Sequence, residues 1–380
     1  MTNPLLEAAQ QLEDRLLSAE MPDDQRDEGR AYVAGLVRFE LQRALIGSDP
    51  GRPRLTLCMD DVSKWGLENP DNVYRAATID GDAEYVLRGE RGTTADLAVE
   101  VLTGLAGDDG TTGEGISSID LDELRVDDDG RFEIRIGGDP GPGNHLATGP
   151  AAGEVFVRQT LGDWDETVGA LTIERVWPAP DAPQLTSGLL TLAAGRLTAA
   201  AGFLDTFAAT WRETVPVNAT TPPAAGKGGG FLPGQRNAVG QFTLRRGEAL
   251  VVIIEPVPAR SLSLAIGHHR WFTSFDYRTR RCHLNRAQAR VSSDGRLHFV
   301  VCATDPGVPN WIDTVGHERG FMFLRYQGLS GAEPTAPTFA VVPADEVRSL
   351  LPDDEPTVDA TTRATDMDRR RRAVDRRFRP

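Results

Sequence analysis

Residues 240–266 read GQFTLRRGEALVVIIEPVPARSLSLAI, and this stretch decides the class of fold. It holds short apolar runs separated by Gly, Pro and charged residues, with no helical segment between them. Runs of this length bounded by turn residues are typical of β-strands. Together with two later runs they predict an antiparallel sandwich or jelly-roll-like body over 236–350. The predicted strands are 240–244, 249–254, 261–266, 297–303 and 321–326.

A second strand-rich region is expected over 51–182. Its runs are short, and Phe132-Glu133-Ile134-Arg135-Ile136 alternates strictly between apolar and charged residues. Such alternation places one face of a strand in the core and the other in water. Residues 105–119 are polar and rich in Gly and Asp, so we expect a loop there. The strands predicted in this region are 74–79, 84–88, 131–136 and 154–159.

Helical spacing appears in three places. Residues 4–20 and 25–46 predict a hairpin of two helices within 1–50, and Asn3 before Pro4 is a typical helix start. This hairpin either docks its apolar face on the body or offers it to a partner. Residues 185–214 carry Leu, Ala, Phe and Trp along one face and predict one long central helix against the sheet. The fold class that results is α+β and β-rich.

Two further segments separate or follow these regions. The long helix and a Gly- and Pro-rich linker occupy 183–235. Within the linker, GKGGG at 226–230 lacks the spacing and the preceding strand of a phosphate-binding loop, so a flexible linker or lid is the better interpretation. The tail at 351–380 is first acidic and then rich in arginine, and we expect a helix that lies along the acidic body.

Composition excludes several classes of partner. The 380 residues carry a net charge of −15, and 40% of them are hydrophobic, which suffices for a sizeable core. An acidic surface repels nucleic acid, so we expect no nucleic-acid partner. Three cysteines without metal spacing favour a reducing compartment. We find no signal segment and no run of about 18 apolar residues, so we expect a cytosolic protein with no membrane contact. The oligomeric state stays open.

Three stretches concentrate aromatic and polar side chains that are hard to explain by packing alone. Residues 268–278 read HHRWFTSFDYR, residues 284–289 read LNRAQA, and residues 305–317 read DPGVPNWIDTVGH. Side chains of these types are the usual components of a small-molecule site, because buried polar groups must be paired or used. We therefore expect the three stretches to form one aromatic-walled pocket.

These stretches also carry a resemblance to a known family. The patterns W-x-x-x-x-D-Y-R at 271–278, L-N-x-x-Q-A at 284–289 and the motif at 305–317 resemble the bacterial domain of unknown function 1214 (DUF1214). Residues 69–74 and 159–165 also resemble full-length members, so the similarity touches roughly two-thirds of the chain. The resemblance implies a shared fold, and it implies no activity.

Three residues are candidates for chemistry. Asp313 and His317 are four residues apart in a turn and could form an acid–base pair, with a hydrogen-bonded structural loop as the alternative. Asp276 could supply a further carboxylate, although a close pair with Arg278 would make it a structural anchor. The candidate substrate-binding residues are His269, Trp271, Tyr277, Arg278, Asn285, Gln288, Asn310 and Trp311.

A metal site is not expected. Adjacent side chains on a strand point to opposite faces, so His268 and His269 cannot both enter one site. One of them with Asp276, Asp313 or His317 would be the only set available, and no metal-binding spacing supports it. We also expect no cofactor, because the dinucleotide and hydrolase motifs are absent.

Two classes of function remain. The first is a cofactor-independent enzyme, or pocket protein, that acts on a small organic molecule of sugar-like, terpenoid or aromatic character. In that hypothesis Asp313 and His317 transfer protons while Arg278 binds an anionic or carbonyl group. The second is a non-catalytic β-sandwich that binds a ligand or serves as a scaffold. An enzyme site should hold a group of shifted pKa in a cleft, whereas a scaffold should hold paired, dry polar groups.

Overall fold

The computed structural model describes residues 3–17, 21–66, 68–177, 186–226, 232 and 234–378. Four α-helices are assigned in these residues, and the second runs directly into a π-helical turn at Arg43–Gly47. A 3-10 helix covers Ala344–Leu350. Asn3 accepts a hydrogen bond from the amide of Leu5, as the sequence predicts for a helix start. The helices are α1 (Pro4–Leu16), α2 (Asp23–Gln42), α3 (Thr186–Thr214) and α4 (Ala360–Phe378).

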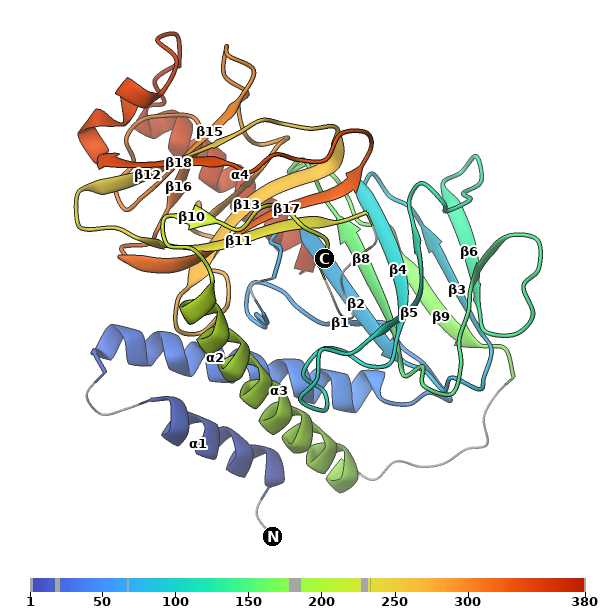
Figure 1. The fold of residues 1–380 in the computed structure, drawn as a ribbon. Coiled ribbons are helices and arrows are strands. Elements are labelled where there is room, and N and C mark those ends of the chain that lie inside the picture. The colour runs from blue at the N-terminus through green and yellow to red at the C-terminus, as the bar shows by residue number, and fades with distance from the viewer. Residues whose placement is uncertain are drawn as a thin grey trace.

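The N-terminal half of the body is a β-sandwich (Figure 1). One sheet has the strand order β1-β2-β8-β4-β5 and the other has the order β7-β6-β3-β9. All pairs are antiparallel except β6 with β7. The strands are β1 (Thr56–Leu57), β2 (Asn72–Thr78), β3 (Tyr85–Glu90), β4 (Asp96–Leu102), β5 (Gly115–Asp120), β6 (Arg131–Ile136), β7 (Asn144–Leu146), β8 (Glu154–Thr160) and β9 (Leu171–Arg175).

The C-terminal half is a second β-sandwich (Figure 1). Its sheets have the orders β10-β11-β17-β13-β14 and β16-β15-β12-β18, and β15 with β16 is the parallel pair. The strands are β10 (Ala219–Thr220), β11 (Arg236–Thr243), β12 (Glu248–Ile254), β13 (Ala259–His268), β14 (His283–Asn285), β15 (Leu297–Cys302), β16 (Trp311–Asp313), β17 (Arg319–Leu329) and β18 (Thr338–Pro343).

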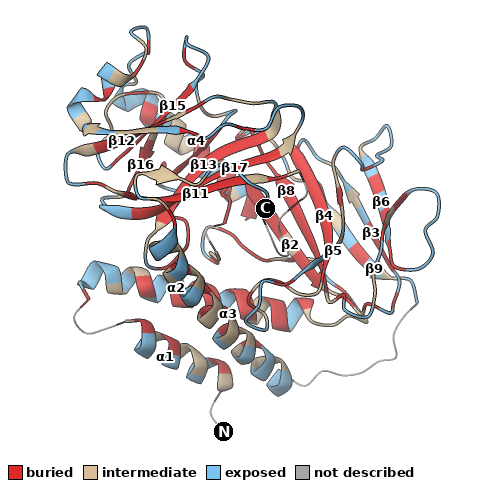
Figure 2. Ribbon diagram, viewed as in Figure 1, coloured by how far each residue is buried: buried red, intermediate tan, exposed pale blue. Residues whose placement is uncertain are grey.

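Strand alternation separates the core of the C-terminal sandwich from the core under the helices. In β17, Met322, Leu324 and Tyr326 point into the core of the C-terminal sandwich. The alternate residue Phe323 points away from that core and packs with the helices. The N-terminal sandwich has its own core, which includes Leu87 and Val157. As a result, the sheets that contain β8 and β17 each bury their second face against helices and loops (Figure 2).

Helix α3 belongs to this helical layer. By length and composition alone it could cross a membrane. However, Ala193, Leu197 and Leu204 are buried and share a core with residues of α1 and α2. Its exposed face carries threonines, among them Thr198 and Thr206, whose hydroxyls donate to carbonyls four residues earlier. The helix therefore packs as the amphipathic surface helix of a globular protein.

A buried ion cluster joins α2 to the N-terminal sandwich. The Arg43 guanidinium lies 2.6 Å from Asp108, 3.4 Å from Glu40 and 3.7 Å from Glu154. One arginine thus faces three carboxylates in a site that excludes water. Burial, partly offset by Arg43, raises the pKa of Glu40 from 4.5 to about 7.

This cluster should make stability depend on pH. The raised pKa means that the folded state holds a proton on Glu40 that the unfolded state releases above about pH 4.5. That contribution is complete below pH 4.5 and is lost as pH rises through about 7. Relative to Glu40→Gln, the wild-type protein should lose about 2–3 kcal/mol between pH 4.5 and 8. Urea unfolding of both proteins across this pH range measures the difference in their free energies of unfolding. For an exposed control, Glu213→Gln, the difference from wild type should not change with pH.

Helix α4 fastens the C-terminal end of the chain to the body. Arg363, Arg370 and Arg377 recur every seven residues and are all buried. Arg370 donates to the carbonyls of Tyr277 and His283, and its guanidinium lies 4.6 Å from the ring centre of Trp164. The tail helix expected from the sequence is therefore present, and it inserts arginines into the body in addition to lying along it.

The fold prediction is confirmed in its main features. The fold is α+β and β-rich, with an N-terminal helical hairpin and a long central helix. The sequence predicted one sandwich, over 236–350. A second sandwich is present, because the strands of 51–182 form two sheets that pack on each other. The loop expected at 105–119 contains the start of β5. Of the predicted linker, residues 227–230 lie outside the described residues.

Candidate functional site

The motif at 284–289 contributes to a buried hydrogen-bond network and not to a pocket wall. Its centre is Asp71, which is fully buried. One carboxylate oxygen accepts from Asn285 Nδ2 at 2.9 Å and from Gln288 Nε2 at 3.5 Å. The other lies 2.7 Å from His283 Nε2. These side chains hold two sandwiches together, since Asp71 precedes β2 while His283 and Asn285 belong to β14.

The predicted pair of Asp313 and His317 is not formed. The Asp313 carboxylate accepts from the amide of Val315 at 2.7 Å and lies 3.6 Å from Arg280. Burial raises the pKa of Asp313. His317 instead lies 3.0 Å from Glu28 of α2. The turn between them directs the two side chains to different partners, so the prediction that Asp313 and His317 pair with each other is wrong.

The stretch around Asp276 is structural. Asp276 is exposed and accepts hydrogen bonds from the amide of Arg278 and the hydroxyl of Thr279, which closes a turn. Arg278 forms two hydrogen bonds, of 2.7 and 3.0 Å, with Asp375 of α4 and not with Asp276. Tyr277 is buried in the core of the C-terminal sandwich. None of these residues lines the cavity described below.

The predicted aromatic and amide residues also have structural partners. Trp271 is buried and stacks on Tyr32 of α2, with 5.6 Å between ring centres. Asn310 Nδ2 donates to the carbonyl of Arg290, and Trp311 Nε1 donates to the carbonyl of Cys302.

Residues His268 and His269 turn to different partners, as strand alternation predicts. Nε2 of His269 lies 2.9 Å from Gln241 Oε1, whereas His268 faces Glu28. The motif stretches therefore do not converge on one pocket.

A cavity of about 360 Å³ lies elsewhere, between the two sandwiches and beneath the helices. The strands contribute Tyr74, Phe156 and Phe323, and α3 contributes Phe207 and Trp211. Volume and composition are those of a site for a small organic molecule. The other lining residues are Phe39, Met59, Trp65, Gly66, Glu68, Leu102, Leu105, Ala106, Thr112, Arg158, Phe203, Leu204, Gln235, Phe272 and Arg325.

Aromatic side chains dominate one side of the cavity. Trp211 packs edge-on against Phe272 with 4.8 Å between ring centres and lies 5.8 Å from Phe323. Phe207 lies 5.1 Å from Trp211, and Phe203 stacks on Trp65 at 6.1 Å. Rings fixed by one another present a rigid apolar surface to a ligand.

Two arginines line the cavity from the sheets, each beside an aromatic ring of its own strand. Arg158 of β8 is buried and lies 2.7 Å from Glu100 of β4, so its charge is balanced within the sheet. Arg325 of β17 is buried, and its guanidinium lies 3.6 Å from the ring centre of Phe323. Burial lowers the pKa of Arg325 to about 10, which leaves it protonated at neutral pH. A positive group of this kind favours a ligand with an anionic or carbonyl group.

The cavity wall also holds one carboxyl group, that of Glu68. It accepts a hydrogen bond from the hydroxyl of Ser274. Burial raises the pKa of Glu68, although Lys64 and Ser274 partly oppose the shift. A carboxyl group with a raised pKa in a cavity wall is a candidate for proton transfer.

The opening of the cavity lies on the helical side. Thr112 is exposed, and Ala106, Trp65 and Phe203 are partly exposed, whereas the lining residues on the sheets are buried. Gly107 packs closely on α3, because a Cβ there would lie 3.2 Å from the Cα of Ala200. The loop between β4 and β5 therefore lies over the cavity and borders its entrance.

Sequence reasoning missed this cavity for a physical reason. Its residues come from α2, α3, four strands (β2, β4, β8 and β17) and several loops, and they do not form a recognisable motif in any one of these. The sequence predicts a core face for α3, and both Leu204 and Trp211 pack in that core while also lining the cavity. Of the stretches quoted from the sequence, 69–74 contributes Tyr74 and 268–278 contributes Phe272.

One solved structure identifies the relatives of this chain. A crystal structure of an uncharacterised protein from Burkholderia cenocepacia is 30% identical, has a TM-score of 0.80, and the match covers 90% of this chain and 96% of that one. The chain belongs to the family of that protein. A structure from Vibrio parahaemolyticus is 9% identical with a TM-score of 0.48, over 90% of this chain and 100% of that one, too weak to support inference. No family model matches, and no curated protein does.

Proposed function

We propose that this protein binds a small aromatic or polycyclic organic acid in the cavity between the two sandwiches. The observation that carries the proposal is that a rigid aromatic wall and the buried guanidinium of Arg325 line the same cavity. The apolar body of the ligand would pack against Phe207 and Trp211, and its acid group would face the guanidinium. The volume of about 360 Å³ lies within the range of small-molecule sites.

Two broader assignments accompany this proposal. The buried free thiols of Cys58, Cys282 and Cys302 support a cytosolic location. The three sequence motifs support membership of the family of unknown function 1214. In this proposal those motifs serve to hold the two sandwiches and α4 together around the cavity.

The proposal is tested with two matched probes. Trp65 and Trp211 line the cavity, so binding of 2-naphthoate should quench their fluorescence. Arg325→Met should weaken 2-naphthoate binding about 10- to 100-fold, the size expected for a charged hydrogen bond of about 1.5–3 kcal/mol. The same variant should change the binding of uncharged 2-naphthalenemethanol by less than about three-fold.

The control is Arg319→Met, which removes an exposed arginine from the same strand. It should bind both probes as the wild-type protein does. Equal weakening of both probes in Arg325→Met, or none in either, contradicts the proposed role of Arg325. Melting temperatures of both variants separate lost binding from lost folding.

A second function is favoured by Glu68. If the bound acid is also converted, the candidate for proton transfer among the described lining residues is Glu68, whose carboxyl accepts a hydrogen bond from the hydroxyl of Ser274. In that case Glu68→Gln should bind 2-naphthoate like the wild-type protein but abolish any turnover of the natural ligand. Unchanged turnover in this variant would exclude Glu68 as the acid–base residue.

A further inference from the structure

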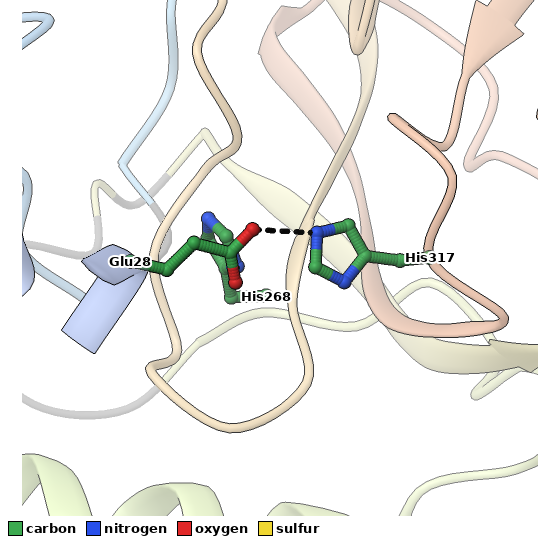
Figure 3. Close-up of side chains that lie close together, drawn as sticks. All are labelled: Glu28, His268 and His317. Atoms are coloured by element: carbon green, nitrogen blue, oxygen red, sulfur yellow. Dashed lines mark hydrogen bonds and ion pairs between the residues drawn. The ribbon is translucent and has the colours of Figure 1, made fainter. Parts of the chain in front are cut away.

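Three potential metal ligands meet outside the cavity. Glu28 Oε1 lies 3.0 Å from His317 Nε2, and Glu28 Oε2 lies 3.5 Å from His268 Nδ1. All three ligand atoms lie within 4.8 Å of one another (Figure 3). None of these residues lines the cavity, so the cluster is independent of the proposed ligand site.

The fold holds this cluster from three directions. Glu28 comes from α2, His268 ends β13, and His317 stands in the turn before β17. The ring of Phe275 lies 4.6 Å from His268 and 4.7 Å from His317, so one aromatic ring fixes both imidazoles. Ligands on rigid elements with fixed ring orientations favour a defined coordination geometry.

Strained backbone lies close to both histidines. Val315, two residues before His317, has a φ of 56°, which a β-branched residue rarely adopts. Phe272, four residues after His268, has a φ of 50°. Such conformations persist only where the surroundings impose them, and they concentrate at functional sites. Here the two strained residues lie in the turns next to His268 and His317.

The three ligand atoms lie close enough together to be drawn around one metal ion. With metal–ligand bonds of about 2.0–2.1 Å, neighbouring ligand atoms in a tetrahedron are about 3.3 Å apart. The distance of 3.0 Å from Glu28 Oε1 to His317 and that of 3.5 Å from Glu28 Oε2 to His268 involve different carboxylate oxygens, and one set of three ligand atoms lies within 4.8 Å, so small side-chain movements would close the site around an ion. The ammonium of Lys64 is nearby but is turned to the carbonyls of Ser274 and Phe275, 3.2 and 2.8 Å away.

We propose that Glu28, His268 and His317 form a mononuclear site for a divalent transition-metal ion, with Zn²⁺ as the best fit. Two imidazoles and one carboxylate are a ligand set that Zn²⁺ uses when a fourth position stays open. The side chains are 15–32% exposed, so water can reach that position. The ion replaces the hydrogen bond between Glu28 and His317 and ties α2 to the C-terminal sandwich.

The test measures Zn²⁺ binding to the full-length protein after treatment with EDTA. Titration against a chromophoric chelator should give one Zn²⁺ per chain with a dissociation constant in the micromolar range or below. Glu28→Gln and His317→Ala should each weaken binding at least 100-fold. His145→Ala, which removes a histidine bonded to the Gly137 carbonyl, should leave binding unchanged.

Spectroscopy of the wild-type protein with Co²⁺ provides a second readout that does not depend on any variant. The account expects the intense visible absorption of a four-coordinate Co²⁺ ion, lost on adding Zn²⁺. Absence of stoichiometric Zn²⁺ binding, or equal affinity in wild type and both variants, would show that these three residues are not a metal site. An octahedral Co²⁺ spectrum would contradict the proposed four-coordinate geometry. Circular dichroism of the variants in EDTA confirms that they are folded.

Discussion

Replacing Arg370 with alanine should destabilise the protein by about 3–5 kcal/mol, one of the two largest effects expected of any single change. The Arg370 side chain is 2% exposed and donates to two main-chain carbonyls, of Tyr277 and His283. Alanine leaves both acceptors without a donor and removes the guanidinium from the face of Trp164. Each buried acceptor left unpaired costs about 1–3 kcal/mol, and the lost packing adds to this.

The control is the next residue on the same helix. Arg371 is exposed and pairs with Asp368 one turn earlier. Arg371→Ala should therefore change stability by no more than about 0.5 kcal/mol. Urea unfolding of both variants measures the contrast. Similar losses in the two variants would contradict the role of the inserted arginines, because alanine forms helices at least as well as arginine.

Replacing Asp71 with alanine should cost a similar amount, about 3–5 kcal/mol. Its carboxylate is the shared acceptor for Asn285 and His283, and all three side chains are almost completely buried. Without it, polar groups of both partners are left unpaired between the sandwiches. An exposed control, Asp353→Ala, removes one negative charge in the same way and should have little effect on stability.

A double-mutant cycle distinguishes the energy of the Asp71–Asn285 hydrogen bond from a general loss of stability. Asp71→Ala and Asn285→Ala each remove the same hydrogen bond, so their combined cost should be smaller than the sum by about 1–3 kcal/mol. Additive losses would show that the two residues do not act together. Such additivity would contradict the structural role assigned to the motif at 284–289.

The elements of this fold were predictable where local pattern decides them. The helical hairpin, the central helix and most strands follow from the spacing of apolar residues and from residues that start helices or form turns, such as Pro4 and Gly247. The second sandwich was not predicted, because pairing between distant strands is not encoded in any local pattern. Strand β17 is an example. Arg325 and Gln327 alternate with apolar residues, a pattern typical of a strand face exposed to solvent, but in the structure both residues are buried under a second layer of protein.

The candidate site was less predictable for a related reason. Motif residues such as Trp271, Asn285 and Trp311 stand out in the sequence, and the structure uses them to join elements. The cavity is built from ordinary apolar residues whose meeting depends on tertiary packing. Glu28, which meets His317, carries no signal in the sequence, since an acidic residue on a helix normally faces water.

The central claim is that the cavity between the sandwiches binds an aromatic acid, and a crystal structure with 6-bromo-2-naphthoate tests it most directly. Anomalous scattering from bromine locates the probe without ambiguity. The account predicts the naphthalene ring against Phe207 and Trp211, with the carboxylate within hydrogen-bond distance of Arg325. Bromine found only on the surface, or a carboxylate directed away from Arg325 within the cavity, would contradict it.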